Sequence, residues 1–328
     1  MDNLRTLLVT SVLALLVVSG RTPLAEELLG PKNPVPEGYK IIEGDILVPL
    51  DFSFDGAGGI GTRGCFDTNW WPGGVVPFEW DANASAGNRT AMLAAMAEWE
   101  AVANVSFVER TGEHDYVHIQ DSTVNNSNVG CIGGEQTINI FNWGTRFTMV
   151  HELGHTLGLW HEQSRPDRNT YVTIHLGAID DLEEHNFDMH SGAETYGPYD
   201  FDSVMHYDQC DFSDCACPAN CVPIEVNEPW HSQWQSTIGQ RMHLSTLDQL
   251  TMQMMYPRAG DVFVDKSYGG ATENGSFLSP YKAFPDGAAA VPSGGRVVIQ
   301  PGTYTSCAGT YSTAMTLWAP LGDVTLGP

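Results

Sequence analysis

The stretch His151-Glu-Leu-Gly-His-Thr-Leu-Gly-Leu-Trp-His161 constrains the fold and the chemistry of this protein more strongly than any other part of the sequence. His151 and His155 are four residues apart, so on a helix their side chains lie on one face and can bind one ion. Gly158 has no Cβ and can end such a helix with a positive φ. The chain can then turn back and bring His161 to the same ion, so the spacing predicts three imidazole ligands around one metal.

The chemistry of these residues favours a catalytic zinc. Three neutral imidazoles leave a fourth coordination position for water, whereas a structural zinc fills all four positions with protein ligands. Zinc lowers the pKa of bound water to about 7, and Glu152 lies beside the two helical ligands, where it can accept the proton. Given the composition of the chain, the full pattern arises by chance only about 10⁻⁴ times. We therefore predict one Zn²⁺ per chain, held by His151, His155 and His161, with Glu152 as general base.

Further motifs around these ligands resemble the metzincin clan of zinc endopeptidases, and specifically the astacin family. The run His161-Glu-Gln-Ser-Arg-Pro-Asp-Arg168 is similar to the astacin signature, and Ser203-Val-Met-His-Tyr207 is similar to the Met-turn of the family. Trp70-Trp-Pro-Gly-Gly-Val-Val-Pro77 resembles the start of the mature domain, and residues 244–256 resemble its last helix. The resemblance spans about 62–257.

The resemblance implies a fold and several residue roles. It implies an α+β fold with a mixed, mainly antiparallel sheet and long helices. Met205 would form the apolar floor beneath the metal, and Tyr207 would be a switchable fifth ligand that swings away to donate a hydrogen bond to the oxyanion. Glu162 would meet the new N-terminus after activation through a buried charge interaction; a solvated carboxylate is the alternative. His206, inside the Met-turn, is assigned no metal role.

The N-terminal 61 residues predict an export signal and a pro-segment. A short apolar run over 7–18 favours a signal peptide over 1–20, with an uncleaved anchor or a buried helix as alternatives. Residues 21–61 are rich in Pro and Gly and favour an extended, cleavable segment. Its Ile42-Glu-Gly-Asp45 resembles the Phe-x-Gly-Asp element of astacin-like zymogens, with Ile42 in place of Phe. The resemblance implies that Asp45 takes the zinc position meant for water; a turn with an exposed Asp is the alternative.

Periodicity predicts helices and strands within the protease-like region. Apolar residues at helical spacing predict a helix over 88–103 with Met92, Met96 and Trp99 on one face, and a second helix from about 145 to 158. A third helix over 246–255 would begin with a capping pair, Ser245 and Asp248. Strands are predicted over 105–108, 116–119 and 137–141. This order of elements favours an α+β fold over a doubly wound sheet.

The C-terminal segment, 258–328, has a different composition, dominated by Gly, Ser, Thr and Tyr. Short strands over 293–304 and 315–327, separated by turns, resemble the opening rungs of a right-handed parallel β-helix. The segment is too short for the stacked rungs that a β-helix needs on its own. It is interpreted as an auxiliary module with glycans as candidate partners.

The seven cysteines are odd in number, so at least one is unpaired or pairs between chains. Four of them cluster after the Met-turn at Cys210, Cys215, Cys217 and Cys221. In an exported protein this cluster predicts two local disulfides, with a second structural zinc as the alternative. Cys65 and Cys131 are candidates for a further pair.

Charge excludes some classes of partner. Fifteen Lys and Arg against 40 Asp and Glu give a net charge of −25, which argues against nucleic acid and against anionic membrane surfaces. The predicted function is that of a secreted, extracellular zinc endopeptidase made as a zymogen and acting on protein or peptide substrates. Two alternatives are a catalytically silent metzincin domain used for binding or adhesion, and a carbohydrate-active β-helix protein with a protease passenger.

Overall fold

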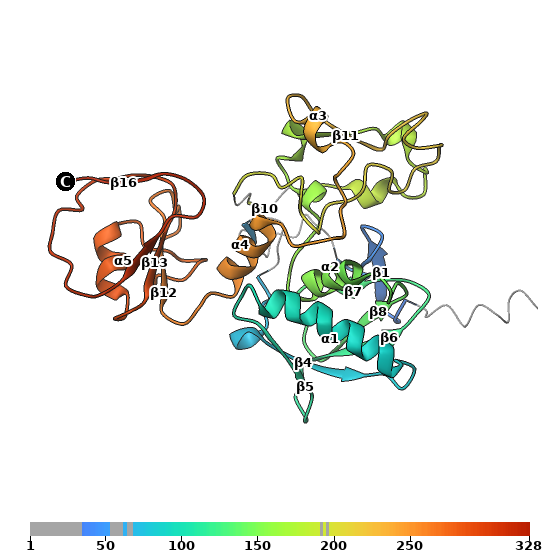
Figure 1. The fold of residues 1–328 in the computed structure, drawn as a ribbon, viewed down its shortest axis with the longest axis horizontal. Coiled ribbons are helices and arrows are strands. Elements are labelled where there is room, and N and C mark those ends of the chain that lie inside the picture. Colours follow the sequence, from blue (N-terminus) through green and yellow to red (C-terminus); the bar gives the residue numbers. More distant parts are fainter. Residues whose placement is uncertain (1–34, 53–61, 64–67, 191–192, 195–196) are drawn as a thin grey trace, which may run out of the picture.

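A computed structural model describes residues 35–52, 62–63, 68–190, 193–194 and 197–328 (Figure 1). The predicted signal peptide and Cys65 lie outside the described residues. Within these ranges no helix has the length and apolar character needed to span a membrane.

The central sheet has four strands in the order β5-β4-β6-β8, and each neighbouring pair is parallel. Its strands are β4 (Val75–Trp80), β5 (Ser106–Glu109), β6 (Tyr116–Asp121) and β8 (Glu135–Ile140). The prediction of a mainly antiparallel sheet is therefore wrong for this sheet. β5 pairs with the first part of β4, from Val75 to Phe78, whereas β6 pairs with the second part, from Phe78 to Trp80. β5 therefore ends close to the point along β4 where β6 begins, on the other side of β4. Six residues are enough to link β5 to β6 across β4 without reversing the direction of the chain.

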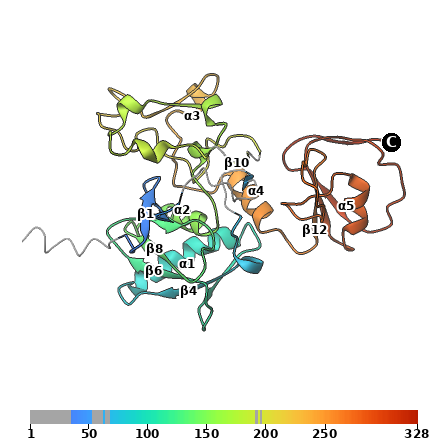
Figure 2. The ribbon, with the colours of Figure 1, turned by 180° about the vertical axis from the view of Figure 1, so that it is seen from behind.

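Two helices lie side by side against this sheet, α1 (Ala86–Glu100) and α2 (Arg146–Thr156) (Figures 1 and 2). The predicted apolar face of α1 is confirmed, since Met92, Met96 and Trp99 are buried in the main core. The Trp99 indole N–H also donates a hydrogen bond to the Val150 carbonyl of α2 at 2.9 Å. α1 therefore fixes the position of the helix that carries the histidine motif.

Part of the predicted pro-segment, residues 39–49, forms a hairpin that packs on the protease region. β1 (Tyr39–Ile42) pairs antiparallel with β2 (Ile46–Pro49), and β2 pairs parallel with β7 (Ser127–Asn128). Ile42, which replaces the expected Phe, is 8% exposed and shares a small apolar cluster with Trp160. The hairpin is thus anchored by ordinary apolar packing as well as by its strand pairing.

The residues after the histidine motif form a second lobe, which lies above α2 in Figure 1. Its short strands β9 (Val172–Ile174) and β11 (Ile224–Val226) pair antiparallel, and α3 (His231–Trp234) follows. Another short pair joins distant parts of the chain, since β3 (Thr62–Arg63) pairs parallel with β10 (Ala193–Glu194). The described part of the protease region also contains five short 3₁₀ helices: η1 (Pro72–Gly74), η2 (Glu162–Ser164), η3 (Arg168–Thr170), η4 (Leu176–Ala178) and η5 (Glu184–Phe187).

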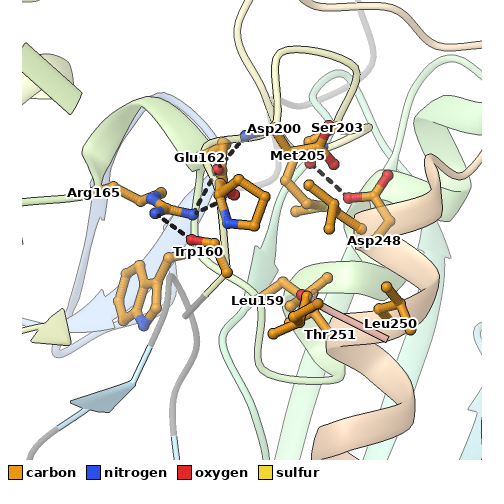
Figure 3. A pocket seen from close by; sticks show the side chains of 14 residues that line it. Leu159, Trp160, Glu162, Arg165, Asp200, Ser203, Met205, Asp248, Leu250 and Thr251 are labelled. Atoms are coloured by element: carbon orange, nitrogen blue, oxygen red, sulfur yellow. Dashed lines mark hydrogen bonds and ion pairs between the residues drawn. The ribbon is translucent and has the colours of Figure 1, made fainter. Parts of the chain in front are cut away.

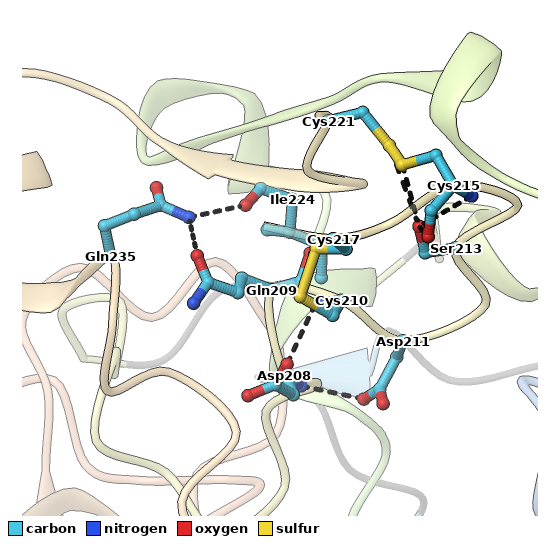
Figure 4. Close-up of a disulfide and its surroundings, with 10 residues drawn as sticks. All are labelled: Asp208, Gln209, Cys210, Asp211, Ser213, Cys215, Cys217, Cys221, Ile224 and Gln235. Carbon is cyan, nitrogen blue, oxygen red and sulfur yellow. Dashed lines mark hydrogen bonds between the residues drawn. A yellow bond between two sulfur atoms is a disulfide. The ribbon is translucent and has the colours of Figure 1, made fainter. Parts of the chain in front are cut away.

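Two disulfides fasten the loop after the Met-turn (Figure 4). They join Cys210 to Cys217 and Cys215 to Cys221, which confirms the prediction of two local disulfides over a second structural zinc. Among the described residues, Cys131 and Cys307 form no disulfide.

The last protease helix, α4 (Thr246–Met255), begins with the predicted capping box of Ser245 and Asp248. The C-terminal segment follows with β12 (Asp261–Val264), α5 (Phe284–Ala290), β13 (Arg296–Ile299), β14 (Gly302–Tyr304), β15 (Thr316–Trp318) and β16 (Val324–Leu326). Its strands form two parallel sheets, β12-β13-β15 and β14-β16. The segment contacts the protease region, since Phe277 stacks on Trp70 with ring centroids 6.3 Å apart.

Candidate active site and metal centre

The three histidines of the motif converge on one point. The Nε2 atom of His151 lies 3.1 Å from that of His155 and 3.2 Å from that of His161. α2 carries the first two ligands and ends at Thr156, and Gly158 has φ 111°, which lets the chain turn back to His161 as predicted. Four tetrahedral ligands at the usual zinc distance of about 2.0–2.1 Å lie about 3.3–3.4 Å apart. The spacing of the imidazoles therefore fits zinc.

The opposite ring nitrogens hold the first two imidazoles in the tautomer that a metal requires. His151 Nδ1 donates to the Val204 carbonyl at 2.8 Å, and His155 Nδ1 donates to the Leu159 carbonyl at 2.7 Å. Burial lowers the pKa of His151 to about 3 and also lowers that of His155. Both rings are therefore neutral and direct a lone pair from Nε2 to the common point.

The Asp45 carboxylate completes the cluster. Its Oδ2 lies 3.1 Å from His151 Nε2, and its Oδ1 lies 3.3 Å from His161 Nε2 and 3.6 Å from His155 Nε2. Oδ1 is buried without a hydrogen-bond partner among the described residues. Oxygen and nitrogen lone pairs that face one another at these distances favour a cation between them. Asp45 and the three histidines are therefore a four-ligand set suited to one metal ion.

The third histidine has a different environment from the other two. Its Nδ1 lies 2.7 Å from the Glu43 carboxylate, and its ring is fully buried. Although burial opposes the charge, the Asp45 and Glu43 carboxylates raise the pKa of His161 to about 9. A cation bound at Nε2 takes the place of that proton, because a metal ligand must be deprotonated.

Glu152 lies on α2 between the two helical ligands and is 1% exposed. Burial and the charge of Asp45 raise the pKa of Glu152 well above its usual range. Its Oε2 has no hydrogen-bond partner within the described part of the chain. Glu152, Asp45, His151 and Tyr207 line one open cavity of about 390 Å³. A buried carboxyl that faces this cavity is suited to exchange a proton with a group bound there.

The Met-turn, Ser203–Tyr207, packs against α2, the helix that carries His151 and His155. Met205 is 2% exposed, and Val204 supplies the carbonyl that orients His151. Asp248 of α4 fixes this turn, because its carboxylate accepts from Ser203 Oγ at 2.6 Å and from the Val204 amide at 2.9 Å. The sequence predicts Asp248 only as a helix cap, and no local pattern indicates this second role, because 45 residues separate Asp248 from Ser203.

Replacing Gly154 by alanine should destabilise the protein, because the new Cβ would lie 2.7 Å from Met205 Sδ and 3.4 Å from Trp99 Cζ2. Overpacking costs about 1–3 kcal/mol, which outweighs the gain of roughly 1 kcal/mol from removing a helical glycine. We expect a lower midpoint in urea unfolding. Gly87→Ala in α1 is the matched control, because its Cβ meets only Ser85 Oγ, at 3.8 Å. Equal midpoints for the Gly154 variant and the wild type would contradict tight packing of the Met-turn on α2.

Tyr207 lies beside the metal cluster and is 3% exposed. Its ring centroid is 4.5 Å from that of His161, and its hydroxyl donates to the Glu43 carbonyl. Burial, followed by the charges of Asp45 and Glu43, raises the pKa of Tyr207 well above its usual range, so the hydroxyl keeps its proton. Tyr207 is therefore a hydrogen-bond donor, and in this structure its hydroxyl is paired with the backbone of Glu43.

Glu162 lies at a small cavity of about 30 Å³ behind the Met-turn (Figure 3). Its carboxylate accepts from Arg165 Nη1 at 3.0 Å and from the Asp200 amide at 2.8 Å, and its side chain is only 12% exposed. Burial and the neighbouring charges of Asp248 and Glu162 raise the pKa of Asp200 to about 8. Three carboxyl groups therefore share this cavity, and Glu162 is not the solvated carboxylate that the sequence left as an alternative.

Two further residues at the site were missed by sequence analysis, Glu43 and His190. Glu43 is 1% exposed and binds both His161 and His190, the latter with 2.5 Å between Oε1 and Nε2. Glu43 lies within the Ile42–Asp45 motif, which could have drawn attention to it. His190 has no ligand spacing, and nothing in the sequence brings it to a residue 147 positions away.

Comparisons with known proteins agree with this geometry. A family model described as Astacin, a peptidase family, matches residues 65–257. Tolloid-like protein 2 from Homo sapiens is 34% identical over 233 residues, which cover 66% of this chain and 21% of that protein. Astacin-like metalloprotease toxin 1 from Loxosceles intermedia is 31% identical over 242 residues, covering 70% of this chain and 86% of the toxin.

A solved structure is also similar. It is that of high choriolytic enzyme 1, a hatching enzyme zinc-protease from Oryzias latipes, with 29% identity and a TM-score of 0.51. The match covers 58% of this chain and 94% of that one. By contrast, the chain spans only about a fifth of the length of tolloid-like protein 2. The family model covers more than half of the chain and includes the histidine motif and the Met-turn. The chain therefore belongs to the astacin family of peptidases.

Proposed function

We propose that this protein is a secreted zinc endopeptidase made as a latent precursor, and that it hydrolyses peptide bonds in protein or peptide substrates. The observation that carries the proposal is the cluster of His151, His155 and His161, whose fourth position is taken by Asp45 of the pro-segment. One Zn²⁺ per chain would be held by the three histidines. Once bound, it supplies Lewis-acid chemistry, which polarises a carbonyl and makes water acidic enough to deprotonate near pH 7.

The side chains around the cluster have matching roles in this reaction. Glu152 would accept the proton of the attacking water and later deliver it to the leaving amine. Tyr207 would be released from the Glu43 carbonyl when the segment leaves, and its hydroxyl would then donate to the developing oxyanion. A catalytically silent binding module is not favoured, because the ligand set, the buried acid and the tyrosine lie around one cavity.

The domain organisation that goes with this proposal has four parts. Residues 1–20 would be the signal peptide, 21–61 the propeptide, 62–257 the protease domain and 258–328 an auxiliary segment. The two disulfides near the cleft support an oxidising, extracellular location. The parallel strands of the last segment support its interpretation as β-helix-like rungs. Glycan contact through this segment stays a prediction.

Glu162 is proposed to bind the new N-terminus after activation. The cavity beside it is lined by three carboxyl groups, Glu162, Asp200 and Asp248, and Arg165 is a cation that contacts Glu162. An incoming ammonium would lower the free energy of this buried acidic group. Activation would thus be coupled to the residue that follows the third metal ligand.

Latency gives the direct test of the proposed function. A cleavage-resistant precursor, with Arg63 and its neighbours changed, should not hydrolyse a fluorogenic peptide, because Asp45 has a high effective concentration at the metal. Asp45→Ala should make this uncut precursor partly active, since the segment still obstructs the cleft but no longer caps the cluster. In the precursor that can be cut, cleavage near 62–64 should give full activity.

Asp51→Ala is the matched control for this test, because Asp51 is an exposed acid of the same segment. The uncut precursor with this change should stay inactive. Equal activity with and without Asp45→Ala would overturn the capping role, and an inactive cut protein would overturn the proposed function.

A further inference from the structure

We propose that His161 and His190 form a second carboxylate-binding pocket, beside the metal cluster, in which Glu43 anchors the pro-segment. The proposal rests on the proposed function, because it assumes that residues 35–52 are an inhibitory segment. Its ligand class is a side-chain carboxylate presented by a tight turn of a peptide. Astacin-like pro-segments resemble this chain in the metal-facing Asp45, whereas the pocket for Glu43 follows from the contacts of this structure alone.

The pocket supplies a hydrogen-bond partner to each oxygen of the Glu43 carboxylate. Glu43 Oε1 lies 2.5 Å from His190 Nε2, and Oε2 lies 2.7 Å from His161 Nδ1. All three side chains are less than a tenth exposed. The indole of Trp160 covers His190, with ring centroids 4.5 Å apart. A buried carboxylate with a separate ring donor at each oxygen is a built site, since the same group without partners would be strongly unfavourable.

His161 divides the two sites. Its Nε2 faces Asp45 and the other two histidines, whereas its Nδ1 faces Glu43. His190 is no member of the metal-binding cluster. Glu43 therefore keeps His190 as a hydrogen-bond donor whether or not a metal is bound. Its carboxylate also fixes His161 with Nε2 free for a metal, as carboxylates do for many histidine ligands.

The backbone of the turn is shaped to deliver this carboxylate. Glu43 has φ 47°, a conformation that residues with a Cβ adopt rarely, and Gly44 follows with φ 72°. The Glu43 carbonyl accepts from Tyr207, and the Gly44 amide donates to Asn186 Oδ1 at 2.9 Å. Phe212 closes the turn from outside, because a Cβ on Gly44 would lie 2.3 Å from its ring. The turn thus points Glu43 into one pocket and Asp45 into the other.

Because Asp45 and Glu43 anchor the hairpin at two different places, loss of one anchor should leave the other in place. Removing the metal would remove its bond to Asp45, but Glu43 would still hold the hairpin. Removing the Glu43 carboxylate would loosen the hairpin with or without metal. The two contributions should therefore be separable in the intact precursor.

Hydrogen exchange of the 39–49 hairpin in the full-length precursor tests the pocket, with the metal present and after chelation. Glu43→Gln keeps the shape but removes the charge, and hydrogen bonds to charged groups contribute enough for a change of at least about tenfold in exchange. We expect this increase in both metal states. Glu37→Gln is the matched control, because Glu37 is an exposed acid of the same segment. Unchanged exchange in α1 would show that the fold is intact.

His190→Gln supplies the second, independent variant. By itself, His190→Gln should increase hydrogen exchange of the hairpin. Combined with Glu43→Gln it should add little, because both changes break the same contact between Glu43 and His190. Wild-type exchange in both single variants would overturn the proposal, and so would an effect of Glu43→Gln that disappears on chelation. Failure of the proposed function would instead appear as a cut protein that hydrolyses no peptide, whatever the exchange of the hairpin.

Discussion

Glu152→Gln should abolish nearly all peptide hydrolysis by the cut protein, while zinc content and unfolding midpoint stay close to those of the wild type. The amide has the size of the carboxyl but cannot accept the proton of the attacking water, and general-base catalysis contributes about 10²–10⁴ in rate. His151 and His155 keep their carbonyl partners, Val204 and Leu159, so the ligands stay in place. The measurement is kcat on a fluorogenic peptide beside zinc analysis of the same sample.

Two comparisons sharpen this experiment. Glu98→Gln changes a surface acid of α1 that pairs with exposed Arg146, so it should leave kcat unchanged. Tyr207→Phe removes one oxyanion donor, worth about 10²–10³ in kcat, so it should retain more activity than Glu152→Gln. A wild-type kcat in Glu152→Gln would show that another group takes the proton.

Chelation of zinc should abolish the activity of the cut protein completely, and added Zn²⁺ should restore it. Elemental analysis should find about one zinc per chain, since the three histidines and one open position form one catalytic site. His155→Ala should lose this zinc, because its Nε2 lies within the ligand cluster. Zinc loss should also lower the melting temperature, because a ligand that binds only the folded state stabilises it.

His175→Ala is the control for the metal experiment. His175 is a surface residue paired with Glu225 at 2.7 Å, and it lies outside the metal-binding cluster. This variant should keep its zinc and its activity. A folded, active His155→Ala protein without zinc would contradict the metal assignment.

The predictions from sequence succeeded where the information is local. The four-residue spacing of His151 and His155 fixes their common face, because an α-helix has 3.6 residues per turn. The turn at Gly158 and the capping box of Ser245 and Asp248 follow from the same short-range geometry. The two disulfides within 210–221 are likewise local, since the paired cysteines are seven and six positions apart.

The sheet shows where local information fails. The strands over 105–108 and 116–119 were predicted at nearly the right positions, but their direction was not, because a six-residue link is compatible with reversal or with forward crossing. The choice between reversal and forward crossing depends on which parts of β4 pair with β5 and with β6. Side chains of β4, β6 and β8 share the main core with α1 and α2, which are distant in the sequence from one another.

The candidate metal ligands, the candidate base and the family could be read from the sequence, because these depend on residue types at fixed short spacings. The distant groups that complete the site became visible only in the folded chain. Asp248 fixes the Met-turn, and Glu43 reaches His161 and His190 across 118 and 147 residues. Such contacts arise from the path of the chain through the fold. Local spacing cannot encode them, because many chain paths satisfy the same local preferences, and the packing of the complete core selects one of them.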